Sequence, residues 1–135
     1  MHDARLTAAR VARLATLDPD GRPHLVPIVF ALDGHTLYSA VDRKSKRSRR
    51  LRRIENARAR ADVTILVDHY AEDWRDLWWI RLRGRARVLD TGTEHERALA
   101  LLREKYPQYR DEPPTGPVLA VDVTETREWS ANTGP

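Results

Sequence analysis

The 135-residue sequence contains no cysteine. This absence excludes disulfide bonds, thiol catalysis and cysteine-ligated zinc. The sequence also lacks a run of about 18 apolar residues, so we expect no membrane-spanning helix. The first ten residues lack the apolar core of a signal peptide. We therefore expect a single domain, covering residues 1–135, in the cytoplasm.

Lysine is scarce, so arginine supplies most of the positive charge. Lysine occurs only at Lys44, Lys46 and Lys105, although the formal net charge is +4. Arginine binds phosphate and carboxylate groups as a planar fork, and a positive balance favours anionic partners. The same bias is also typical of a GC-rich genome, and both interpretations stay open here.

Several catalytic signatures are absent as well. The five histidines show no metal-ligand spacing, so we expect no metal site. The nucleophile pattern G-x-S-x-G is missing, and so are the P-loop and the G-x-G-x-x-G pattern. The sequence therefore predicts no catalytic residue for acid–base or covalent chemistry.

Hydrophobic alternation predicts a mainly β (α+β) fold. Six strands are predicted, at residues 11–17, 24–32, 35–41, 62–69, 78–89 and 118–129. Helices are predicted at residues 4–13, 45–57 and 93–106. Several strands joined by hairpins favour a six-stranded antiparallel barrel with two or three flanking helices.

Local signals refine this prediction. Pro27 falls inside the second predicted strand and predicts a bulge or a free sheet edge. Ser45 is a plausible N-cap for the second helix. Thr93 and Glu96 predict a capping box at the start of the third. Residues 107–117 are rich in proline and predict a loop.

The segment "DRKSKRSRRLRR", residues 42–53, is the most informative motif. Lys44, Lys46 and Arg47 cluster at the start of a predicted helix, where the helix dipole disfavours cations. Free N–H groups at the same end attract anions. The segment therefore predicts a phosphate site, with a solvated basic helix as the alternative. Nucleic-acid binding is a weaker alternative, because no aromatic residues lie between the arginines.

Tryptophan and tyrosine gather late in the chain, at Tyr70, Trp74, Trp78, Trp79 and Trp129. Such residues usually fill cores or interfaces, but they could also form the walls of a site for a planar cofactor.

The strand "WWIRLRGRARVL" places an arginine at every second position. Since strand side chains alternate between faces, Ile80 and its apolar partners are expected to fill the core. The arginines then point outward, and they are Arg81, Arg83, Arg85 and Arg87. Solvation or pairing with acids is the simplest interpretation. A role for Arg81 or Arg83 in a dimer or on a cofactor is the alternative. Gly84 indicates a bend or a close backbone approach.

Three stretches, in this order, resemble a known superfamily. They are "VARLATLDPDGRPHLVPIVFAL", then "SKRSRRLRR" with "ADVTILVD", and then "WWIRLRGRARVLD". The chain resembles the flavin and deazaflavin oxidoreductases of the split β-barrel fold, the pyridoxamine 5′-phosphate oxidase-like group. Within that group it looks most similar to the actinobacterial branch that uses coenzyme F-420.

The resemblance implies a homodimer with two cofactor sites at its interface. Lys46 and Arg47 match the basic pair that holds the cofactor phosphate, and Ser45 matches the small residue before it. The other cofactor-binding residues that it implies are Pro27, Ile28, Val29, Ser39, Ala40, Lys44, Arg49, Trp79 and Trp129.

The resulting prediction is an F-420-dependent oxidoreductase that transfers a hydride between the deazaflavin and a small organic substrate. The absence of catalytic residues agrees with this, because the cofactor carries the chemistry. An FMN-dependent enzyme of the same fold is the first alternative. A non-catalytic cofactor-binding protein and a basic nucleic-acid-binding module are the others. No residue specifies the substrate.

Overall fold

The computed structural model describes residues 3–41 and 48–132, with only the backbone of residues 48–51. The strands in this part are β1 (Ala12–Leu17), β2 (Pro23–Ile28), β3 (Ala31–Asp33), β4 (Thr36–Ala40), β5 (Asp62–His69), β6 (Trp78–Leu89) and β7 (Val118–Ser130). The helices are α1 (Ala4–Ala8), α2 (Ser48–Ala59), α3 (Thr93–Lys105) and α4 (Gln108–Asp111), with a 3₁₀ turn, η1 (Trp74–Asp76).

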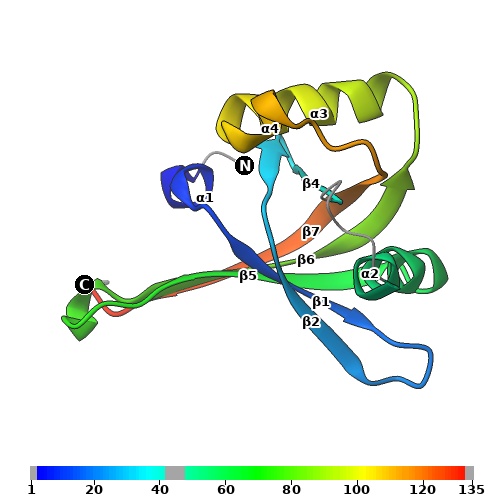
Figure 1. Cartoon of the computed structure of the whole chain (residues 1–135). Helices are drawn as coiled ribbons and strands as arrows, with labels where there is room; N and C mark the ends of the chain where they lie inside the picture. The colour runs from blue at the N-terminus through cyan, green and yellow to red at the C-terminus, as the bar shows by residue number, and fades with distance from the viewer. Residues whose placement is uncertain (1–2, 42–47, 133–135) are drawn as a thin grey trace.

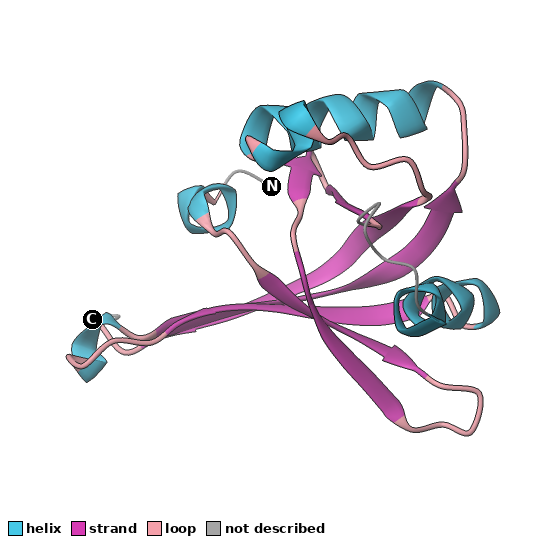
Figure 2. Ribbon diagram, in the orientation of Figure 1, coloured by secondary structure: helices cyan, strands magenta, loops and turns pink. Residues whose placement is uncertain are grey.

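The seven described strands form one antiparallel sheet in the order β2-β1-β5-β6-β7-β4-β3. Both edge strands, β2 and β3, belong to the same chain segment and are separated only by residues 29 and 30. The sheet is therefore strongly curled, as Figures 1 and 2 show, but its hydrogen bonding does not close into a ring. The predicted class is confirmed, whereas the prediction of six strands in a barrel is corrected to seven in an open curled sheet.

The extra strand arises because the second predicted strand, 24–32, is interrupted at Phe30. The Phe30 N–H donates to the Tyr106 hydroxyl oxygen at 3.1 Å. The same hydroxyl lies 3.1 Å from the Phe30 carbonyl oxygen and 3.0 Å from the Arg10 carbonyl oxygen. Because it has a single proton, it donates to one of these two carbonyls at a time. A side chain from the end of α3 thus replaces the strand partner of Phe30. Local alternation cannot reveal a contact 76 residues away.

Two apolar clusters hold the fold together. The larger lies inside the curled sheet and includes Leu14, Ile65 and Leu82. The smaller lies under α3 and α4, where Leu102 packs with residues of β3, β4 and β7. Figure 1 shows these two helices covering β4. Strand β4 is consequently buried on both faces from Leu37 to Ala40.

Strands β5, β6 and β7 extend into a long arm that carries the C-terminal end of the chain (Figure 1). The predicted bounds of β5 and β6 are confirmed to the residue. The pairing of β6 with β7 shifts at Arg83/Gly84, where a bulge occurs. A Cβ atom at position 84 would clash with the Asp122 carbonyl oxygen and lie 2.9 Å from Val121 Cγ1. The predicted close approach at Gly84 is therefore confirmed.

Three local predictions need correction. The capping box is wrong, because the N-cap of α3 is Gly92, which makes no side-chain cap, and Thr93 is already helical. The first predicted helix, 4–13, ends at Ala8, and β1 follows. The proline-rich stretch contains the short helix α4. Within residues 3–41 and 48–132, no helix is long and apolar enough to cross a bilayer.

Candidate functional site

The end of β4 and the start of α2 define the candidate site. Ser39 and Ala40 are buried, with 2% and 3% of their surface exposed. Ser39 shares its face of β4 with Leu37, which belongs to the large cluster, so its side chain points into the sheet interior. The Ser39 hydroxyl is buried there and has no hydrogen-bond partner within the described residues.

Arg53 connects this strand end to α2. Its side chain is buried, with 7% of the residue exposed, and its Nη2 donates to the Ala40 carbonyl oxygen at 3.4 Å. A buried guanidinium is unusual and adds a fixed positive charge close to the end of β4. In the sequence, Arg53 is distinguished only as part of the basic segment 42–53. Its burial beside Ile54 is a tertiary effect that the apolar pattern does not show.

The following turn of α2 is hydrogen-bonded to the end of β1 and to the turn after it. The buried Asn56 amide donates to the Thr16 hydroxyl at 3.1 Å and to the Asp18 carboxylate at 3.0 Å. Arg52 pairs with the same carboxylate at 3.4 Å. The Asn56 amide and the Arg52 guanidinium hold the pKa of Asp18 below its usual value. These contacts orient α2, and therefore its N-terminal end, relative to β1 and β4.

The central residues of the predicted phosphate site, Lys44, Ser45, Lys46 and Arg47, lie outside the described residues. Arg49 is in the first turn of α2, but its side chain is likewise not described. The first turn of α2 holds no acidic residue. No carboxylate in that turn would therefore compete with an anion for these cations.

Pro27, Ile28 and Val29 lie on or just after the edge strand β2. Pro27 pairs with β1 on one side only, so the predicted free edge is confirmed. The Ile28 side chain is buried in the large cluster, whereas Val29 packs against the smaller one. Because Ala31 pairs with Tyr38, the residues before Ala31 lie at the same end of the β3–β4 hairpin as Ser39.

Trp79 and Trp129 face each other on β6 and β7. They lie on the outer face of the sheet, since the neighbouring Ile80 belongs to the core. Ala40 pairs with Val118, and Trp129 is eleven residues farther along β7. At about 3.3 Å per residue the separation is roughly 35 Å. One chain therefore does not bring the two tryptophans to the β4–α2 site.

The alternating arginines of β6 have different surroundings. Arg87 forms two-pronged ion pairs with Glu94 and Asp122, the shortest at 2.8 and 2.7 Å. Arg85 pairs with Asp62 at 3.0 Å, and Arg83 with Glu125 at 3.6 Å. Pairing with acids is thus confirmed for three of the four.

Arg81 differs from the other three arginines. Its guanidinium lies 5.5 Å from the centre of the Trp79 ring. Its Nε is buried without a hydrogen-bond partner in the described structure. Arg127 stands directly opposite on β7, so two like charges face each other there. The hypothesis that Arg81 contacts a partner chain or a ligand therefore stays open.

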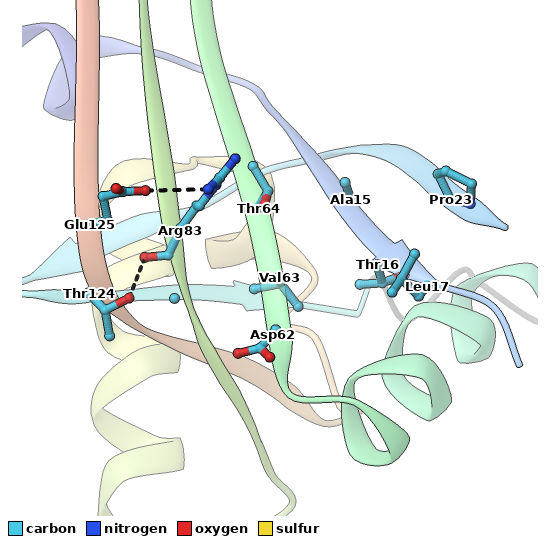
Figure 3. A pocket seen from close by; sticks show the side chains of 11 residues that line it. Ala15, Thr16, Leu17, Pro23, Asp62, Val63, Thr64, Arg83, Thr124 and Glu125 are labelled. Carbon is cyan, nitrogen blue, oxygen red and sulfur yellow. Dashed lines mark hydrogen bonds and ion pairs between the residues drawn. The ribbon is translucent and has the colours of Figure 1, made fainter. Parts of the chain in front are cut away.

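The outer face of β1, β5, β6 and β7 also carries a cavity of about 570 Å³ (Figure 3). Figure 3 shows Arg83 directed toward Glu125, and the Thr124 hydroxyl donates to the Arg83 carbonyl oxygen at 3.3 Å. The polar groups drawn there mainly satisfy one another. The remaining lining residues include Ala15, Leu17 and Pro23, so this surface is largely apolar.

A family model described as pyridoxamine 5′-phosphate oxidase matches residues 1–130. The chain belongs to this family. No curated protein matches the sequence. A conserved hypothetical protein of Mycobacterium tuberculosis has a similar structure, with a TM-score of 0.77 and 20% identity over 97% of this chain and 86% of that one.

Two further solved structures share the fold of this pyridoxamine 5′-phosphate oxidase family member. An FAD-binding protein of Mesorhizobium loti is 24% identical, with a TM-score of 0.68, over 93% of this chain and 88% of that one. The heme storage protein HutZ of Vibrio cholerae is 14% identical, with a TM-score of 0.71, over 94% of this chain and 89% of that one. At such identities the likeness establishes the fold alone.

Proposed function

We propose that the protein is an oxidoreductase that binds a flavin-type cofactor at the β4–α2 junction. The observation that carries this proposal is the buried Arg53 guanidinium on the Ala40 carbonyl, beside a helix start without acidic residues. A buried cation and the N–H groups of a helix start suit the phosphate of such a cofactor. Lys46 and Arg47 would hold the phosphate, with Ser45, Lys44 and Arg49 beside them.

The cofactor would supply the hydride-transfer chemistry. The chain's own residues would bind and orient it: the backbone of Pro27, Ile28 and Val29 on one side, and that of Ser39 and Ala40 on the other. A protein that only binds and orients the reacting cofactor needs no acid–base or nucleophilic residues, and the sequence shows no motif for them.

We further propose coenzyme F-420 as the preferred cofactor, with FMN as the alternative. F-420 carries a tail of glutamates beyond its phosphodiester, and the basic segment continues past the phosphate pair at Lys44, Arg49 and Arg50. Excess positive charge there favours the longer and more acidic molecule.

A titration with F-420, with its tailless form and with FMN tests this preference. The double variant R49A/R50A should weaken binding of tailed F-420 more than binding of the tailless form. Equal losses for both would remove the support for F-420. A double variant at exposed positions, R22A/R103A, removes the same charge elsewhere and serves as the control.

We also propose a homodimer. The outer face of β1, β2 and β7 exposes Leu25 and Trp129, with 66% and 45% of their surface exposed, and Val11 and Leu17 to a lesser degree. These exposed apolar side chains fit an interface with a second copy of the chain. The dimer would also allow Trp79 and Trp129 to reach a cofactor bound to the partner chain.

A non-catalytic cofactor carrier is the second candidate, because a heme storage protein shares the fold. Turnover separates the two. Reduced cofactor should be oxidised by a substrate in the presence of the protein if it is an enzyme, and should remain reduced in a screen of substrates if it is a carrier. A nucleic-acid-binding module would instead show binding that weakens steeply with added salt.

A further inference from the structure

A second cavity, of about 670 Å³, lies where the end of α1, the end of α3 and α4 meet. Its walls are mostly apolar or aromatic, and the lining residues are Arg10, Val29, Tyr106, Pro107, Gln108 and Tyr109. Rings of Tyr106 and Tyr109 meet edge-on with their centres 6.0 Å apart. None of these lining residues carries a carboxylate.

Two cations from distant parts of the sequence lie near the Tyr106 ring. Arg10 lines the cavity, whereas Lys105 is not among its lining residues. The Lys105 ammonium lies 3.9 Å from the centre of the Phe30 ring and 5.4 Å from that of Tyr106. The Arg10 guanidinium lies 5.6 Å from the Tyr106 ring and donates to the Lys105 carbonyl oxygen at 2.8 Å. Within the described part of the chain, neither cation forms an ion pair with a carboxylate.

Holding a partly buried ammonium near a second positive charge is unfavourable when no anion is bound. Burial, and then the charge of Arg10, lower the pKa of Lys105 to about 8. Two like charges held beside aromatic walls, without an acid, would both be stabilised by an anion. The apolar walls would accept a flat ring at the same time.

We propose that this cavity binds a small planar organic anion, of which an aromatic carboxylate is the simplest example. Arg10 would bind the carboxylate from the cavity wall, Lys105 would reach it from beside the Tyr106 ring, and Tyr106 with Tyr109 would contact the ring of the ligand. Val29 lines the cavity and also lies on the segment expected to face the cofactor. The anion is therefore the candidate substrate, a role that rests on the proposed function, although binding itself does not.

The test is a titration of the full chain, without cofactor, with benzoate, the neutral analogue benzamide and inorganic phosphate. Benzoate should bind more tightly than either of the others. Lys105→Met, which keeps the stem on Phe30, should weaken benzoate binding by about 10- to 100-fold, and so should Arg10→Gln. Arg103→Gln removes one charge from the exposed side of α3 and should leave binding unchanged.

The pH dependence adds a readout that a merely structural role would not give. Benzoate affinity should fall as the pH rises through and above about 8, because Lys105 then loses its charge. Lys105→Arg should bind benzoate without this fall. The other groups facing the ligand are the Arg10 guanidinium and the hydroxyls of Tyr106 and Tyr109. Burial raises the pKa of Tyr106.

Equal affinity for benzoate and benzamide, or unchanged benzoate binding in both single variants, would overturn the proposal. Phosphate binding as tightly as benzoate would contradict the requirement for a ring. Lys105→Met should also bind F-420 or FMN as the wild type does. Failure of the anion site is therefore distinguishable from failure of the cofactor site.

Discussion

Removing the Tyr106 hydroxyl, by Tyr106→Phe, tests why β2 and β3 are separate strands. Phe30 is fully buried, and its N–H has the Tyr106 hydroxyl oxygen as its acceptor at 3.1 Å. Phenylalanine keeps the ring, so no large cavity is created. A buried N–H without an acceptor costs about 1–3 kcal/mol. We expect the free energy of unfolding to fall by that amount, which is roughly 3–6 °C in Tm per kcal/mol for a domain of this size.

Urea unfolding at one fixed protein concentration, followed by tryptophan fluorescence, measures this change. Tyr70→Phe is the matched control, because Tyr70 is 75% exposed and the same oxygen is removed. The control should lie within about 0.5 kcal/mol of the wild type. A Tyr106→Phe variant as stable as the control would show that the hydroxyl does not hold the Phe30 backbone, and it would refute the explanation of the strand break.

Three further predictions concern packing, charge and assembly. Gly84→Ala should lower the free energy of unfolding by about 1–3 kcal/mol, because the new methyl group would clash with the Asp122 carbonyl. Gly116→Ala is the control and should change the free energy of unfolding little, because the nearest atom would be 3.5 Å from the new methyl group. Equal urea midpoints for the two variants would contradict the predicted clash. The Arg87 guanidinium lowers the pKa of Glu94 to about 2, so the ionised carboxylate stabilises the fold above pH 4.5 and this contribution is lost as the pH falls through about 2. Glu94→Gln should therefore be less stable than the wild type at pH 7, by at most about 1 kcal/mol for so exposed a pair, and the difference should vanish below about pH 2. A difference independent of pH would contradict this assignment. Leu25→Glu should shift light-scattering mass from dimer to monomer, whereas Ala100→Glu on the exposed side of α3 should not; a mass unaffected by Leu25→Glu would argue against the outer face as the interface.

Strands with a long and regular pattern could be predicted from the sequence alone. β5 has a mostly β-branched and apolar centre at residues 63–67, and β6 alternates over twelve residues, so the local pattern is enough to predict both strands. The prediction of one strand at 24–32 was wrong because its interruption depends on a distant residue. Its interruption at Phe30 depends on Tyr106, which local pattern cannot connect to it. The supposed capping box failed because the chain enters α3 through Gly92, at φ 104°.

In the candidate site, too, local signals could be predicted from the sequence, whereas contacts made by folding could not. The basic segment and Pro27 could be recognised in the sequence because charge and proline are local signals. The burial of Arg53 could not, since a guanidinium in a helix normally lies in solvent, and its contact with the Ala40 carbonyl forms only in the folded chain. The cavity lined by Arg10 and Tyr106 was not predicted, because these two residues are far apart in the sequence and come together only through folding.

The central claim is that the β4–α2 junction binds the phosphate of a flavin-type cofactor. The most direct measurement is a fluorescence titration of the purified protein with F-420 and with FMN, repeated with K46A/R47A and with the control R22A/R103A. We predict saturable binding, tighter for F-420, that K46A/R47A loses and the control retains. Binding of neither cofactor, or equal binding by all three proteins, would contradict the account.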